Sequence, residues 1–140
     1  MPMLSALLVN GVPIECINTA AVQYHIPATL IVTVLQIEGG KVGTASKNTN
    51  GTFDFGPMQI NSIWLNKLRA YGFTQDDLQY NPCINVWVGS WILSQRIASS
   101  PEFWKGVASY HSYSLPENTI YKTKILHAYQ TLTNYLSGKV

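Results

Sequence analysis

One carboxylate in this sequence occupies a position that favours acid–base chemistry. Glu38 follows Ile31, Val34 and Leu35 at the spacing of one helical face, so it ends an apolar stripe. Burial of a carboxyl group disfavours its ionised form, and a carboxylic acid that keeps its proton near neutral pH can act as a general acid. The alternative, from this helix alone, is a side chain that extends into solvent, as glutamates usually do.

Two short signals set the limits of the helix that would carry Glu38. Pro27 suits the first turn of a helix, because proline lacks the N–H that would be unpaired there. Gly39 and Gly40 follow Glu38, and glycine is the usual residue of the left-handed cap that ends a helix. We therefore expect a helix over about 27–38, with Glu38 where the next loop begins.

A long polar segment follows this helix. Residues 41–55 (KVGTASKNTNGTFDF) are rich in Gly, Ser, Thr and Asn and show no helical periodicity. Asn50-Gly51 is a strong turn signal and predicts two short strands joined as a hairpin. Loops of this length are uncommon in compact domains unless they serve a function, so we expect the segment to border a site. Residues 56–61 (GPMQIN) then predict a return to the core.

The rest of the chain is predicted to be helical. Apolar periodicity and end signals indicate helices over about 13–24, 27–38, 61–71, 74–80, 82–99, 101–111 and 116–136. Thr74 and Asp77 have the spacing of a capping box, and Ser100 before Pro101 is expected to cap the next helix. The helix over 82–99 is apolar on most sides and should form the centre of the core. The predicted fold class is all-α, with six or seven helices and one small hairpin.

Composition excludes several classes of protein. The chain has 140 residues, 46% hydrophobic and 11% charged, and a net charge of +2, which is too small and too scattered for nucleic-acid binding. No apolar run is long enough to span a membrane. We expect one domain over 1–140, with a core of about 14–129 and peripheral residues 1–12 and 137–140. The first twelve residues lack a basic start and a cleavage site, so no signal peptide is evident.

The sequence contains two cysteines, Cys16 and Cys83. They lack the close spacing of a zinc site or a redox motif. They are either two independent buried thiols or one disulfide between the first helix and a central one. Such a disulfide would contribute about 4 kcal/mol through loop closure and would imply an oxidising compartment.

Several motifs occur together in a characteristic order. The order is Glu38 at the end of an apolar helix, the polar loop, 56–61 (GPMQIN), 81–83 (NPC), 108–112 (ASYHS) and Tyr121 in the last helix. In this order the chain resembles the lysozyme-like (SLT-type) lytic transglycosylases. The resemblance is to the small periplasmic subgroup that accompanies conjugation, pilus and secretion systems, and it covers about Ile14 to Tyr129.

The resemblance implies a role for each matching residue. Glu38 matches the single catalytic acid of the family, Tyr110 and His111 match a segment near the acid, and Tyr121 matches a tyrosine that approaches the carboxyl. The segment that lines the family's cleft corresponds to Gly56, Met58, Gln59 and Ile60, and Gln59 would donate hydrogen bonds to the sugar. Cys16 and Cys83 match a cysteine pair of the conjugation-type subgroup, which favours the disulfide and a periplasmic location.

The implied substrate is the peptidoglycan glycan strand, cut between N-acetylmuramic acid and N-acetylglucosamine to leave a 1,6-anhydro end. No cofactor or metal is implied, and components of a secretion, conjugation or pilus apparatus are the implied partners. Ordinary glycosidases place a second carboxylate about 5 to 9 Å from the first. Asp54 is the candidate for it, and the alternative for Asp54 is a turn residue that bonds its own backbone.

The chain departs from the family pattern at three positions. Gly39 replaces a serine after the acid, Pro57 replaces a leucine, and His111 replaces an asparagine. The loss of Ser and Asn removes two hydrogen-bonding groups. Two alternative functions remain. One is a lysozyme-type hydrolase of the same fold, which would leave reducing ends. The other is a peptidoglycan-binding assembly protein without turnover, which the departures at Gly39 and His111 favour.

Overall fold

The computed structural model describes residues 7–111 and 115–139. Within them lie seven α-helices and one short 3₁₀-helix: α1 (Ile14–Tyr24), α2 (Ala28–Glu38), η2 (Ser62–Trp64), α3 (Leu65–Arg69), α4 (Gln75–Tyr80), α5 (Pro82–Ala98), α6 (Phe103–Ser109) and α7 (Leu115–Leu136). The strands are short: β1 (Leu8–Val9), β2 (Val12–Pro13), β3 (Ala45–Lys47), β4 (Phe53–Phe55) and β5 (Ile60–Asn61). This confirms the predicted helix-rich, lysozyme-like fold class.

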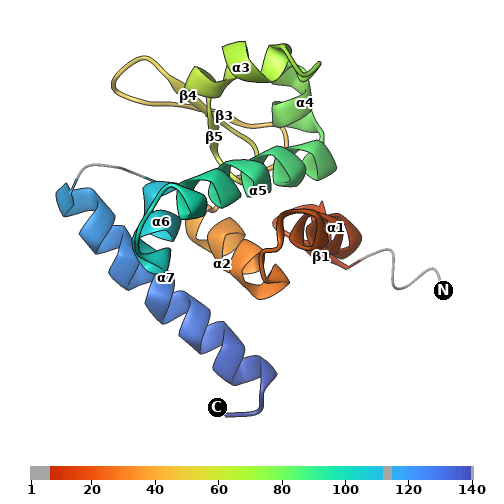
Figure 1. Ribbon diagram of the computed structural model, residues 1–140. Helices are drawn as coiled ribbons and strands as arrows, with labels where there is room; N and C mark the ends of the chain where they lie inside the picture. Colours follow the sequence, from red (N-terminus) through yellow and green to blue (C-terminus); the bar gives the residue numbers. More distant parts are fainter. Residues whose placement is uncertain (1–6, 112–114, 140) are drawn as a thin grey trace.

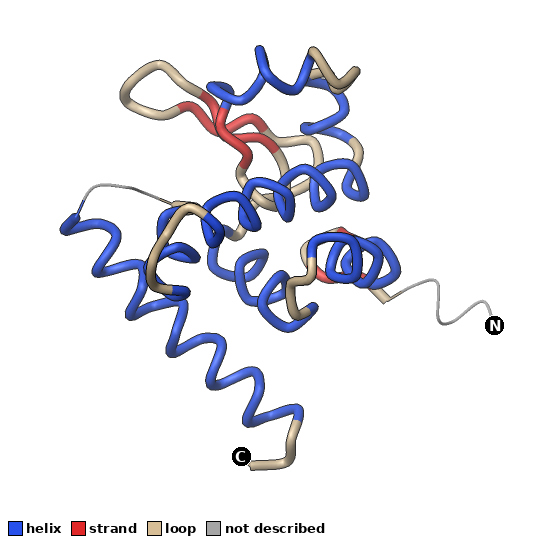
Figure 2. Tube along the Cα trace, in the orientation of Figure 1, coloured by secondary structure: helices blue, strands red, loops and turns tan. Residues whose placement is uncertain are grey.

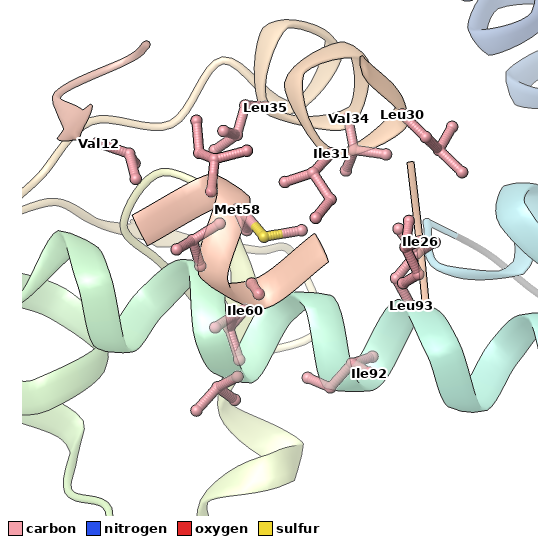
Figure 3. Packing of buried hydrophobic residues seen from close by; sticks show 14 of the residues in the cluster. Val12, Ile26, Leu30, Ile31, Val34, Leu35, Met58, Ile60, Ile92 and Leu93 are labelled. Carbon is pink, nitrogen blue, oxygen red and sulfur yellow. The ribbon is translucent and has the colours of Figure 1, made fainter. Parts of the chain in front are cut away.

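Helix α5 is the centre of the arrangement, as predicted. It contacts α1, α4 and α6, and α7 packs against both α2 and α6. Figure 1 shows α5 crossing between the sheet with α3 and α4 on one side and α1 and α2 on the other. In Figure 3, apolar side chains of α2 and α5 flank Met58, whose side chain is fully buried. Gly89 of α5 leaves room for the Met58 side chain, with which a Cβ at this position would collide.

Helix α2 begins and ends where the sequence predicts. It follows Pro27 and stops at Gly39, which has a φ of 65° and donates its N–H to the Leu35 carbonyl at 3.0 Å. A positive φ is strained for residues with a side chain, so glycine is favoured here. Glu38 is therefore the last helical residue, as expected.

The predicted hairpin is present and is larger than expected. Strands β3 and β4 pair antiparallel around the Asn50-Gly51 turn, and β5 adds a third strand, with Phe55 opposite Ile60. Figure 2 shows this sheet at the base of the long loop. A second pair, β1 and β2, was not predicted. It is joined by Asn10-Gly11, both at positive φ, and the Asn10 amide donates to the Leu35 carbonyl at 3.1 Å.

Most predicted helix caps are confirmed, and one is wrong. Thr74 and Asp77 form the capping box of α4. Glu102, not Ser100, caps α6: its carboxylate accepts the N–H groups of Trp104 and Lys105 at 3.0 and 2.8 Å. The Ser100 hydroxyl instead accepts the Glu102 N–H at 3.3 Å, so Ser100 belongs to the turn before the helix.

The two cysteines form one disulfide. Cys16 of α1 and Cys83 of α5 are bonded, with their Cα atoms 5.3 Å apart, which decides between the two alternatives.

Within residues 7–111 and 115–139, no single helix is both long enough and apolar enough to cross a membrane. Helices α1 and α2 meet these criteria only when they are taken together, and the pair is bent by 120°.

Candidate active site

A polar pocket of about 490 Å³ lies where α2, the β-sheet, and the ends of α6 and α7 meet. The side chains that line it are mostly polar: Glu38, Asn48, Thr49, Asn50, Asp54, Gln59, Ile60, Asn61, Trp64, Ile92, Tyr110, His111 and Glu117. Three carboxylates and one histidine thus share one pocket. Among the described residues, no group of three or more His, Cys, Asp or Glu side chains has the geometry to hold a metal ion.

Glu38 is held in this pocket by residues far away in the sequence. Its side chain is only 8% exposed. The Tyr121 hydroxyl of α7 donates a hydrogen bond to Glu38 Oε2 at 2.8 Å, and His111 Nδ1 lies 3.5 Å from the same oxygen. Packing of α7 on α2 and α6 brings the three residues together.

The two partners of Glu38 also contact each other. The rings of His111 and Tyr121 stack with centroids 4.5 Å apart and planes 2° from parallel. Both contact Oε2, and Oε1 has no hydrogen-bond partner among the described residues. Because the Tyr121 O–H occupies Oε2 as a donor, the proton of a neutral Glu38 belongs on Oε1, where a substrate oxygen can receive it.

The electrostatics of the pocket keep both tyrosines protonated. Burial raises the pKa of Tyr121 far above its ordinary value, and the nearby Glu38 carboxylate adds to the effect. Burial also raises the pKa of Tyr110, with further contributions from Glu38 and Asp54. A hydrogen bond to Glu38 raises the pKa of His111, although partial burial acts in the opposite direction. Tyr121 is therefore a hydrogen-bond donor throughout the physiological pH range.

The end of the turn from Gly56 to Ile60 forms one wall of the pocket, through Gln59 and Ile60. The Gln59 side chain lines the pocket, and its amide donates to the Gly56 carbonyl at 3.0 Å. Gln59 itself has a φ of 54°. Gly40, just after the end of α2, touches this turn so closely that a Cβ would collide with the Gly56 carbonyl oxygen. The two glycines after Glu38 thus have different roles: Gly39 caps helix α2, and Gly40 allows close contact with the turn.

Gly56 and Met58, which the resemblance places along the cleft, lie behind the pocket wall instead. Both are buried, and neither lines the pocket. The Met58 carbonyl accepts the Tyr110 hydroxyl at 2.6 Å, so the backbone of this segment holds Tyr110 at the pocket edge. The side chain of Met58 points into the core because the apolar space beside Gly89 is open to it. Ile60, Tyr110 and His111 do line the pocket. Ser112, the last residue of the 108–112 motif, lies outside the described residues.

Asn85 is a supporting residue that sequence analysis missed. It is fully buried on α5. Its side-chain oxygen accepts the Met58 N–H at 2.9 Å, and its amide donates to the carbonyls of Phe55 and Leu78 at 2.9 and 2.8 Å. The available signal was an asparagine among the apolar residues of the first turns of 82–99.

Asp54 is a strand residue, so the alternative of a turn residue is wrong. It lies in β4, lines the pocket, and accepts a hydrogen bond from the Asn61 amide at 3.0 Å. Alternation along β4 buries Phe55 and directs its neighbour Asp54 to the opposite face. Asn61, Trp64 and Glu117 were not predicted as pocket residues, because only the fold places them in the same pocket as Glu38.

The chain matches a known family and several known proteins. Residues 15–125 match the family model described as the transglycosylase SLT domain. The chain is 30% identical to Invasion protein IagB of Salmonella typhimurium over 131 residues, which is 90% of this chain and 82% of that protein. It is 27% identical to Protein IpgF of Shigella flexneri over 123 residues, which is 87% of this chain and 80% of that protein.

A third relative is the Peptidoglycan-binding-like protein of Escherichia coli O157:H7. The identity is 30% over 105 residues, which is 69% of this chain and 63% of that protein. The family match covers the segment from α1 to the middle of α7, and so includes Glu38, Tyr110, His111 and Tyr121. The chain belongs to the transglycosylase SLT domain family.

Proposed function

We propose that this protein is a lytic transglycosylase that cleaves the bond between N-acetylmuramic acid and N-acetylglucosamine in peptidoglycan and leaves 1,6-anhydro ends. The observation that carries the proposal is the geometry of Glu38. Its side chain is nearly buried in a polar pocket, Tyr121 fixes Oε2 at 2.8 Å, and Oε1 keeps no partner among the described residues. A carboxyl group held in this way is suited to give a proton and take one back.

In the proposed reaction Glu38 acts twice. As the bond between the muramic C1 and the glycosidic oxygen breaks, Glu38 donates its proton from Oε1 to that oxygen, which leaves as a hydroxyl. The resulting carboxylate then accepts the proton of the muramic C6 hydroxyl while the C6 oxygen bonds to C1. Glu38 ends protonated, and no water is consumed. Family membership and the nearly buried side chain of Glu38 support this sequence of steps.

The other pocket residues are proposed to hold the sugar. Gln59, Ile60, Tyr110 and His111 lie along the pocket, where they can contact the glycan. Gly56 and Met58 are proposed to act indirectly, through backbone carbonyls that fix Gln59 and Tyr110.

A lysozyme-type hydrolase is a second candidate, because Asp54 lines the same pocket as Glu38. In hydrolases of this kind a second carboxylate acts as the nucleophile or activates water. The Asn61 amide, which donates to Asp54 Oδ1, would orient that carboxylate. The two candidates differ in their products, since hydrolysis leaves a reducing end. A non-catalytic binding protein is the third alternative, and the departures at Gly39 and His111 are the features that favour it.

We also propose a location and a role. Peptidoglycan is the proposed partner, the disulfide between Cys16 and Cys83 suits an oxidising compartment such as the periplasm, and the whole chain is proposed to act as one domain. The relatives include an Invasion protein and a Peptidoglycan-binding-like protein. The second name supports action on the cell wall, and we propose local opening of the wall during secretion, conjugation or pilus assembly as the role.

The test is digestion of purified peptidoglycan by the parent protein and by Glu38→Gln, with mass analysis of the products. Gln keeps the shape of the side chain and cannot donate an acid proton. The matched control is Glu15→Gln, since Glu15 is exposed on α1 away from the pocket. We expect anhydro-muropeptides from the parent and the control alone. Equal product from Glu38→Gln would refute the role of Glu38, and retention of glycan without any product would identify a binding protein.

A further inference from the structure

His111 occupies an unusual position for a titratable group. Its side chain is 49% exposed, its ring stacks on Tyr121, and its Nδ1 lies 3.5 Å from Glu38 Oε2. Among the described residues that line the pocket it is the one basic side chain. It stands where the family pattern has an asparagine, which carries no charge at any pH.

The surroundings of His111 are mainly acidic. Glu38 of α2, Asp54 of β4 and Glu117 of α7 all raise the pKa of His111, and the hydrogen bond to Glu38 has the largest effect. The other titratable groups on its sides are Tyr110, Tyr121 and Lys124; Lys124 lines a neighbouring pocket together with His111. Because three carboxylates and one lysine lie around His111, the charged imidazolium form of its side chain is favoured.

We propose that His111 is a positioning residue whose charge sets the pH range in which Glu38 can donate a proton. This inference rests on the proposed function, because it assigns a regulatory role within the same site. When the imidazole is protonated, its Nδ1–H donates to Oε2 and stabilises Glu38 as a carboxylate. When it is neutral, this stabilisation is lost.

The consequence for catalysis follows from reciprocity between the two groups. The free energy that stabilises the proton on His111 when Glu38 is ionised also destabilises the proton on Glu38 when His111 is charged. General-acid catalysis needs that proton on Glu38. The charged histidine therefore restrains the first step below its own pKa, and an asparagine at this position would not.

The first test measures the pair directly and needs no turnover. The imidazole signals of the parent, Glu38→Gln and Glu117→Gln are titrated by NMR, with His111 assigned by its disappearance in His111→Asn. We expect the His111 midpoint to fall in Glu38→Gln and to fall less in Glu117→Gln. An unchanged His111 midpoint in Glu38→Gln would overturn the proposal.

The second test compares the pH dependence of anhydro-muropeptide release for the parent, His111→Asn and the control His127→Asn. His127 is exposed on α7. We expect the falling limb of kcat/KM to move to higher pH in His111→Asn alone. Scaled to each protein's maximum, the variant should exceed the parent by roughly threefold to tenfold just below the pKa of His111, as expected for one partly exposed charge near this distance.

The outcomes separate this proposal from the proposed function. Scaled profiles that coincide for the parent and His111→Asn would refute the role of His111 and leave the transglycosylase standing. An absence of product from every protein at every pH would refute the proposed function and the positioning role of His111 with it, even if the NMR titration showed the pair to be coupled.

Discussion

We predict that the hydrogen bond from the Tyr121 hydroxyl is the main interaction that positions the carboxyl group of Glu38. In Tyr121→Phe only this oxygen is removed. The residue is 5% exposed, and its ring stacks on His111, so the phenylalanine ring should keep the same packing. What is lost is the 2.8 Å hydrogen bond to Glu38 Oε2. The carboxyl group can then rotate, and its proton is no longer confined to Oε1.

The size of the effect follows from the kind of hydrogen bond. A hydrogen bond to a charged group contributes about 1.5 to 3 kcal/mol. If the transition state loses all of it, the rate falls by about tenfold to 150-fold. Substrate affinity should change much less, because Tyr121 does not line the main pocket.

The assay is the initial rate of anhydro-muropeptide release, measured for each protein at its own pH optimum. This choice keeps a shift of the pH optimum from being counted as a loss of rate. The control is Tyr135→Phe, which makes the same change on the same helix at a residue that is 68% exposed. Thermal unfolding of both variants checks that the fold is intact. A folded Tyr121→Phe protein within twofold of the parent rate would refute the reasoning.

Three further predictions concern the disulfide, the pocket wall and the second carboxylate. Replacing both Cys16 and Cys83 by Ser should lower the free energy of unfolding by about 4 kcal/mol in urea titrations. A reductant should lower the free energy of unfolding of the parent to the same extent and leave that of the variant unchanged. Gly40→Ala forces a Cβ against the Gly56 carbonyl and should cost about 1 to 3 kcal/mol of stability with loss of activity; stability equal to the parent would contradict this contact. Asp54→Asn should still release anhydro products, whereas loss of all product would favour the hydrolase.

Local signals in the sequence were sufficient for much of the fold. The ends of α2, the capping box at Thr74 and the turn at Asn50-Gly51 each depend on residues within a few positions of one another. Such interactions are visible in the sequence because their partners are neighbours in the chain. The turn at Asn10-Gly11 carried the same signal as Asn50-Gly51 and was missed.

The site itself could be predicted only in part. The hydrogen bond between Glu38 and Tyr121 joins residues 83 positions apart, so periodicity and spacing cannot reveal it, and only the resemblance to a family suggested it. The hairpin around Asn50-Gly51 was predicted, but the local sequence did not show that the Asp54 side chain of β4 lines the pocket with Glu38. The role of Asn85 depends on backbone groups from two other segments that the fold brings to α5.

The most direct test of the central claim is the fate of water in the reaction. Peptidoglycan is digested with the parent protein in water enriched in oxygen-18, and the products are reduced promptly and weighed by mass spectrometry. If Glu38 transfers the proton between the leaving oxygen and the C6 hydroxyl of the same sugar, the muramic ends lack the mass of one water and carry no label. Reducing ends that carry one oxygen-18 atom would contradict the account and identify the protein as a hydrolase.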